Sequence, residues 1–300
     1  MVRKYSFLFI VLASVIWSLD GVLRRSLYSL PPTVVVFYEH LLGLILLAPF
    51  VLKDLPQLKQ LKRNDLFAFT WVALLSGVLG TVMYTAALGQ INYIQYSVVV
   101  LLQQVEPLIA VIFAWLILRE KVTKQYVLWA IPAVVATYLV SFPNLTINFA
   151  NQREEIIAAL LALGSAFAWG SSTAFSRYTL KKFPSHLVTA VRFGLTTPLA
   201  LIFVFLTKAN SQLTMVTPSQ WWALMGIVLT TGMVAMLIYY RGLKYTEAKV
   251  STIAELTWPL SAVFVGYYFF NERLAFTQII GAVLLMISMY KIGMLQKNHV

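Results

Sequence analysis

The chain has 300 residues, of which 60% are hydrophobic and 11% are charged. Soluble domains are closer to about 45–50% apolar and 25% charged, so this composition excludes an ordinary soluble protein and indicates a polytopic membrane protein. The absence of cysteine excludes disulfides, thiolate metal sites and a cysteine nucleophile. The formal net charge of +12 is better explained by basic loops on one side of a membrane than by nucleic-acid binding.

Ten apolar segments are long enough to cross a bilayer, which takes about 20 residues for a helix. The sequence therefore predicts an all-α integral membrane fold with ten transmembrane helices. In chain order the predicted helices cover residues 5–23, 33–52, 66–88, 94–118, 126–143, 156–178, 186–207, 220–241, 249–270 and 276–294. The first segment resembles a signal peptide, but no small-residue cleavage site follows it, so we expect it to be retained.

The basic residues predict the orientation of these helices. Most of the 23 lysines and arginines fall in the segments that are cytoplasmic if the N-terminus is cytoplasmic. The positive-inside rule then places both termini in the cytoplasm. The main exception is the pair Arg24 and Arg25 at an outer helix end, where long side chains can reach the interface.

The second half of the chain repeats the first. Four residues of one half fall on identical residues of the other at one offset, that from Trp17 to Trp169. The further pairs are Pro32 and Pro184, Pro107 and Pro259, and Glu120 and Glu272. This duplication predicts two five-helix repeats, residues 1–150 and 151–300. Five is an odd number, so the second repeat would insert upside down, as in secondary transporters with a binding site at the repeat interface.

Both halves carry matching motifs. Each first helix has a Trp-Ser or Trp-Gly pair, at Trp17-Ser18 and Trp169-Gly170. Each fourth helix has a central proline and ends in Arg119 to Lys121 or in Asn271 to Arg273. In this paired pattern, over about residues 8–140 and 157–294, the chain resembles EamA-type members of the drug/metabolite transporter superfamily.

The resemblance implies a ten-helix fold with a central cavity, lined mainly by the first, third and fourth helices of each repeat. It also implies transport of amino acids, other metabolites or drugs, often outward, in a bacterial inner membrane. The family often has an arginine early in the second helix of each repeat. Arg192 matches that position, but the first half has His40 there, preceded by Glu39.

The fourth helix of the first half carries the strongest candidate site. Glu106 lies in the middle of an apolar run, where a carboxylate is costly and normally faces a water-filled cavity or a partner. Pro107 has no N–H, so the carbonyl of Gln103 loses its helical partner. Gln103 and Glu106 share one face. The alternative is a kinked helix whose polar groups satisfy one another.

The fourth helix of the second half repeats this design with Glu255, Trp258 and Pro259. If the halves face each other, both carboxylates converge with aromatic rings. The predicted substrate-binding residues are Trp17, Ser18, Tyr84, Gln103, Glu106, Trp169, Tyr239, Glu255 and Trp258. Such a set suits an organic cation, and a desolvated carboxyl group can also carry a proton. Packing of the tryptophans and a structural hydrogen bond from Glu255 remain open alternatives.

A second group of polar residues is expected to serve proton coupling or gating. Glu39, His40 and Arg192 lie in second helices, which should be peripheral, and Glu39 could pair with His40, Arg192 or a lipid-facing water defect. Asp20 shares a face with Trp17 near the outer helix end, where a solvated or gating role is expected. Glu106 and Glu255 belong to this group as proton carriers. Glu120 and Glu272 are expected to form local caps or ion pairs.

No enzyme signature is present: the chain lacks G-x-x-x-x-G-K-[ST], H-E-x-x-H and G-x-S-x-G, and its histidines have no metal-ligand spacing. We therefore expect no cofactor, no metal and no enzymatic activity. The predicted function is alternating-access secondary transport, with export of amino acids or amine-bearing metabolites favoured and proton coupling as an option. Import of a quaternary amine such as choline, export of a cationic drug, and a non-transporting receptor or scaffold are the alternatives. The predicted partners are a small solute, the lipid bilayer and protons, in a monomer or homodimer.

Overall fold

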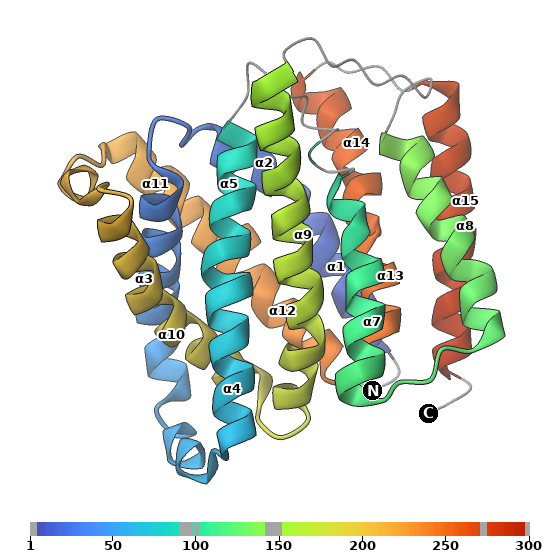
Figure 1. Ribbon diagram of the computed structural model, residues 1–300, viewed down its shortest axis with the longest axis horizontal. Helices are drawn as coiled ribbons and strands as arrows, with labels where there is room; N and C mark the ends of the chain where they lie inside the picture. The colour runs from blue at the N-terminus through green and yellow to red at the C-terminus, as the bar shows by residue number, and fades with distance from the viewer. Residues whose placement is uncertain (1–4, 90–98, 100–101, 142–151, 271–274, 298–300) are drawn as a thin grey trace.

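The computed structural model describes residues 5–89, 99, 102–141, 152–270 and 275–297, and every regular element in these ranges is a helix (Figure 1). The all-α prediction is therefore confirmed for the described residues. Within them, six helical stretches are long and apolar enough to cross a membrane, and two further apolar helices are shorter. The count of ten membrane helices and their inverted relation stay predictions.

The first half supplies helices in each of its five predicted ranges. They are α1 (Ser6–Trp17) with α2 (Asp20–Arg25), α3 (Pro32–Val51), α4 (Arg63–Trp71) with η3 (Val72–Gly80) and α5 (Thr81–Gly89), η4 (Gln103–Val105) with α7 (Glu106–Leu118), and α8 (Lys124–Ser141). A short 3₁₀ helix, η2 (Leu55–Gln60), lies between α3 and α4. Part of the predicted helix 94–118 lies outside the described residues.

The second half follows the same order. Its helices are α9 (Gln152–Leu180), α10 (Ser185–Leu206), α11 (Pro218–Ile227) with η7 (Val228–Gly232) and α12 (Met233–Leu243), α13 (Ala248–Glu255) with α14 (Thr257–Phe270), and α15 (Phe276–Lys297). The short 3₁₀ helix η6 (Asn210–Thr214) joins α10 to α11. In both halves the third helix contains a π-helical segment, η3 or η7. Such wide turns are rare and occur frequently at functional sites.

The two halves interleave. Helix α1 packs on α12, α13 and α14, whereas α9 packs on α4, η3, α5 and α7. Helices α3 and α10 pair at one side of the molecule, and α8 and α15 pair at the other (Figure 1). Each of these contacts joins the first half to the second, so the first helix of either half is seated among helices of the other.

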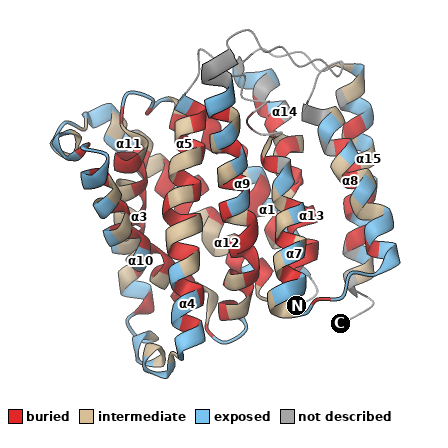
Figure 2. Ribbon diagram, in the orientation of Figure 1, coloured by how far each residue is buried: buried red, intermediate tan, exposed pale blue. Residues whose placement is uncertain are grey.

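Figure 2 shows the buried residues mainly on the parts of the helices that lie between other helices. Many large apolar residues are exposed. Phe50, Trp222 and Tyr268 are each at least 75% exposed. In water such an apolar surface would be unfavourable, but lipid tails solvate it. The outer surface therefore fits a bilayer environment.

The prediction of a free carbonyl at Gln103 is wrong. Pro107 does remove the usual i→i−4 donor, but the backbone N–H of Glu106 donates to the Gln103 carbonyl instead, closing the 3₁₀ turn η4. This 3₁₀ turn interrupts the α-helical run just before Pro107, and we call the interruption the kink. At this kink the backbone carbonyl of Gln103 is therefore not free to bind a ligand.

Gly170 lets α9 pass close to this kink. A Cβ atom at Gly170 would lie 2.7 Å from the backbone oxygen of Glu106, whereas a Cβ atom at Gly89 would meet nothing within 4 Å. We expect Gly170→Ala to destabilise the protein by about 1–3 kcal/mol, because the backbones must move apart. Thermal unfolding in detergent checks this against Gly89→Ala, and equal melting temperatures for the two variants would contradict it.

Candidate functional site

A cavity of about 140 Å³ lies between the two halves. It is lined by every predicted substrate-binding residue except Ser18: Trp17, Tyr84, Gln103, Glu106, Trp169, Tyr239, Glu255 and Trp258. The Ser18 hydroxyl instead donates to the carbonyl of Val15 at 2.6 Å, within the turn between α1 and α2. Of the two predicted kink prolines, Pro107 lines the cavity and Pro259 does not.

Aromatic rings form two reciprocal walls of this cavity. Trp17 of α1 lies 5.0 Å from Tyr239 of α12, and Trp169 of α9 lies 5.2 Å from Tyr84 of α5, measured between ring centroids. Each first-helix tryptophan thus packs on a third-helix tyrosine of the other half. The ring of Trp258 lies 6.1 Å from that of Tyr84. These spacings are those of favourable tilted and edge-to-face ring pairs.

The two central carboxyl groups converge in the same cavity. Glu106 comes from the start of α7 and Glu255 from the end of α13, and they lie close enough for their charges to interact. The Tyr239 hydroxyl donates to Glu255 Oε1 at 2.8 Å. No ion pair involves Glu106 or Glu255 within the described part of the chain. The cavity therefore contains two carboxyl groups that can each be protonated or ionised, and that can bind a solute or a proton.

Three buried polar atoms of the cavity have no hydrogen-bond partner in the described structure: Gln103 Oε1, Trp258 Nε1 and Arg192 Nε. Buried polar atoms are nearly always paired, because an unpaired one loses its bonds to water without replacement. One acceptor and two donors are therefore available to a bound molecule.

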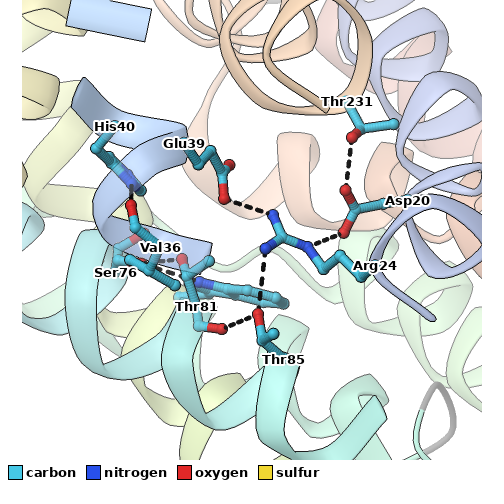
Figure 3. Close-up of polar contacts among 10 residues, drawn as sticks. Asp20, Arg24, Val36, Glu39, His40, Ser76, Thr81, Thr85 and Thr231 are labelled. Atoms are coloured by element: carbon cyan, nitrogen blue, oxygen red, sulfur yellow. Dashed lines mark hydrogen bonds and ion pairs between the residues drawn. The ribbon is translucent and has the colours of Figure 1, made fainter. Parts of the chain in front are cut away.

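A buried cluster of two acids and one arginine borders the cavity (Figure 3). Arg24 donates from Nε to Asp20 Oδ2 at 2.5 Å and from Nη2 to Glu39 Oε2 at 2.8 Å. Its Nη1 donates to Thr85 at 3.1 Å, and Thr231 donates to Asp20 Oδ1 at 2.5 Å. The cluster joins α2 and α3 of the first half to η7 of the second.

This cluster corrects three expectations. Asp20 is buried and not solvated, and Arg24 points to the buried acids and not to the membrane interface. Glu39 forms its ion pair with Arg24, and not with His40, Arg192 or water in a lipid-facing defect. All three residues are at most 6% exposed. The reason is the turn after Trp17, which lets α2 carry Asp20 and Arg24 on one face, i and i+4, toward α3.

The second helices also bring their polar residues inward, against the expectation of a peripheral location. His40 of α3 places Nδ1 2.9 Å from the carbonyl of Val36, and its ring lies 4.8 Å from that of Phe193. Arg192 of α10 donates from Nη2 to Ser76 Oγ at 2.9 Å and from Nη1 to the Tyr240 hydroxyl at 3.0 Å. His40 and Arg192 both line the cavity.

Glu120 forms both an ion pair and a helix cap, as predicted, but its partners are remote in sequence. It pairs with Arg177 at the end of α9, and it accepts the backbone N–H groups of Ala248 and Lys249 at 3.1 and 3.2 Å. It therefore satisfies free N–H groups at the start of α13. Glu272, its counterpart in the repeat, lies outside the described residues.

Several cavity residues were missed by sequence reasoning. They are mostly small hydroxyl residues and include Ser76, Thr81, Ser172, Thr173, Ser176 and Thr231. Serine and threonine are common at helix–helix interfaces in membranes, so nothing in their sequence context separates a cavity wall from packing. The π-helical segments around Ser76 and Thr231 are a signal that only the structure shows.

Comparison with known proteins relates the chain to membrane transporters. The sequence model of the EamA-like transporter family matches residues 4–142 and 156–294. The riboflavin transporter ImpX of Fusobacterium nucleatum is 37% identical over 290 residues, which cover 96% of this chain and 97% of that protein. The uncharacterized transporter YvbV of Bacillus subtilis is 24% identical over 91% of this chain and 87% of its own length.

A solved crystal structure shares the fold with a TM-score of 0.74 at 17% sequence identity, over 99% of this chain and 98% of the other. At that identity the likeness concerns the fold alone. The family match covers nearly the whole length of both halves. The chain is an integral membrane protein that belongs to the EamA-like transporter family.

Proposed function

We propose that this protein transports riboflavin, or a flavin with the same ring system, by alternating access. Its 37% identity over nearly the full length to a protein named a riboflavin transporter supports this choice of solute. The relatives described above give no support for the amino-acid export expected from the sequence. The inner membrane location, the cytoplasmic termini, and the inverted repeats 1–150 and 151–300 belong to the same proposal.

The observation that carries the proposal is the chemistry of the cavity wall. Trp17, Tyr84, Trp169, Tyr239 and Trp258 surround the space with ring faces and edges. A flat, conjugated ring system gains most from such walls, through stacking and edge contacts. A small aliphatic amine would cover only a fraction of this aromatic surface.

The unpaired polar atoms can distinguish a flavin from other flat ring systems, which aromatic walls alone cannot do. Gln103 Oε1 can accept a hydrogen bond and Trp258 Nε1 can donate one. A flavin presents both kinds of group, in its ring N–H and carbonyls and in its sugar-alcohol hydroxyls. Pockets of this type, mostly apolar with a few placed polar groups, are typical of small-molecule sites.

The size of the cavity requires motion for this function. At about 140 Å³ it resembles the engineered protein cavity of about 150 Å³ that holds one benzene molecule. A three-ring flavin is larger, so the surrounding helices must separate when it enters. Because α1 and α9 each pack among helices of the other half, we propose that the moving bodies are two bundles of mixed origin. One is α1 with α12, α13 and α14, and the other is α9 with α4, η3, α5 and α7.

Counterflow in proteoliposomes tests the proposal. Vesicles loaded with unlabelled riboflavin should accumulate labelled riboflavin, and external choline or neutral amino acids should not compete. A protein-free vesicle serves as the control. Exchange of choline or amino acids without exchange of riboflavin would contradict the proposal.

Trp169→Ala tests the aromatic wall in the same assay. We expect this variant to lose about tenfold or more in affinity for riboflavin, because stacking on one aromatic side chain contributes about 1–3 kcal/mol per base in nucleic-acid sites.

Net uptake into riboflavin-free vesicles, and net efflux from loaded ones, test direction and coupling. Repeating these measurements with a pH gradient of either sign shows whether proton movement drives the solute. A rate that is independent of the gradient would leave Glu106 and Glu255 as solute ligands rather than proton carriers. The outward direction expected from the family resemblance stays a prediction until this measurement.

A further inference from the structure

Arg192 is a buried cation without a carboxylate partner among the residues that the structure describes. It is 6% exposed and lines the cavity from α10. The other two arginines that are buried in the described part of the chain are paired, Arg24 with Asp20 and Glu39, and Arg177 with Glu120. An unpaired buried charge is costly, and such groups in a cavity wall are candidates for a functional role such as binding the solute.

The hydrogen bonds of its guanidinium group leave two N–H donors without a partner among the described residues, one on Nε and one on Nη2. The group has five N–H donors in a fixed fork. Nη1 donates to the Tyr240 hydroxyl at 3.0 Å and meets Met236 Sδ at 3.5 Å, and Nη2 uses one donor on Ser76 Oγ at 2.9 Å. Nε has no partner in the described structure. Nε–H and one Nη2–H form the side-on edge of a guanidinium group, which suits two adjacent acceptor atoms, and Ser76 takes only one of the two Nη2 donors.

The neighbours hold the guanidinium group in place. Tyr240 is fully buried, its ring lies 5.9 Å from the Arg192 guanidinium carbon, and its hydroxyl also bonds Ser176 at 3.0 Å. Ser76 belongs to the π-helical segment η3 of the first half. The donor edge is thus fixed by contacts from both halves before any solute binds, which lowers the entropic cost of binding.

We propose that Arg192 binds the edge of the flavin dione ring formed by N1 and the C2 carbonyl, and so determines specificity for this ring. The inference rests on the proposed riboflavin transport. In an oxidised flavin, N1 and the C2 oxygen are adjacent acceptors, spaced much like the two oxygens of a carboxylate, and neither carries a proton. The side-on edge of Arg192 can therefore donate to both at once.

The surrounding charges favour a neutral acceptor over an anion. Asp20 and Glu39 line the same cavity and share the single positive charge of Arg24, and Glu106 and Glu255 line it without an ion pair in the described residues. A phosphate or carboxylate beside Arg192 would therefore also face acidic groups whose charge is not fully balanced. A neutral dione gains charge-assisted hydrogen bonds without that repulsion. Phosphorylated flavins should therefore bind more weakly than riboflavin.

Binding and vibrational spectroscopy on the purified protein test the inference. The probes are riboflavin carrying ¹³C at C2, unlabelled riboflavin and its 2-thio analogue. We expect Arg192→Gln to weaken riboflavin binding about 10- to 100-fold, the range for loss of hydrogen bonds to a charged group. The C2 carbonyl band of the bound flavin should move to higher frequency, because its hydrogen bond is lost. Arg192→Lys keeps the positive charge but loses the planar pair of N–H donors. It should give an affinity and a carbonyl frequency between those of the wild type and Arg192→Gln.

Arg241→Gln is the matched control, since Arg241 is an exposed arginine outside the cavity, and it should leave affinity and carbonyl band unchanged. If Arg192→Gln does not fold, the affinity of the wild-type protein for the 2-thio analogue is compared with its affinity for riboflavin. The sulfur of the analogue accepts hydrogen bonds poorly, so the analogue should bind more weakly. Equal binding of the analogue and riboflavin would overturn the inference, as would an unmoved carbonyl band in Arg192→Gln. Wild-type protein that binds no riboflavin would refute the proposed function itself.

Discussion

Arg24→Met should destabilise the folded protein by about 3–5 kcal/mol, the usual effect of removing one partner from a buried ionic cluster. Asp20 and Glu39 share the Arg24 guanidinium group and are buried with it. Without it, two carboxylates would face each other in a region of low dielectric constant. Thermal unfolding in detergent, followed by size-exclusion chromatography, measures the loss.

The neighbouring arginine supplies the control. Arg25→Met changes the same residue type one position along α2, and it should have a smaller effect because Arg25 is only half-buried. Neutralising the acids as well, in the triple variant Arg24→Met, Asp20→Asn, Glu39→Gln, should recover much of the stability, because no uncompensated charge remains. Equal losses for Arg24→Met and Arg25→Met, or no recovery in the triple variant, would contradict the assigned role of the cluster.

Glu106→Gln should abolish transport or remove its pH dependence while the protein still folds. The side chain lines the cavity beside the kink at Pro107 and interacts with the charge of Glu255. Glutamine keeps the size but can neither ionise nor carry a proton. Loss of a charge-assisted interaction with the solute corresponds to a decrease of about 10- to 100-fold in transport.

Initial rates of riboflavin exchange at two pH values measure this effect. Glu247→Gln is a suitable control, because Glu247 pairs with Lys249 outside the cavity and its side chain is 38% exposed. We expect wild-type behaviour from the control. A Glu106→Gln variant that exchanges riboflavin at the wild-type rate with unchanged pH dependence would remove Glu106 from the mechanism.

Sequence reasoning predicted the class of fold and about half of the residues that line the cavity, because these depend on local properties. Helix length and hydropathy belong to each segment alone, so the membrane-spanning segments could be assigned without tertiary contacts. The repeated pattern around Glu106 and Glu255 placed one acid in each fourth helix. A costly buried acid must face a cavity or a partner, and both glutamates do line the cavity.

Only the tertiary structure decided which groups meet. Hydropathy indicates that Arg24 and Glu39 are near or within the membrane, but their pairing depends on how α2 and α3 pack. The exchange of α1 and α9 between the halves brings Trp17 to Tyr239 and Trp169 to Tyr84. Glu120 caps a helix that begins about 130 residues further along the chain, as the 128-residue separation from Ala248 shows. Such contacts arise from the relative placement of helices, which the periodicity of a single helix does not encode.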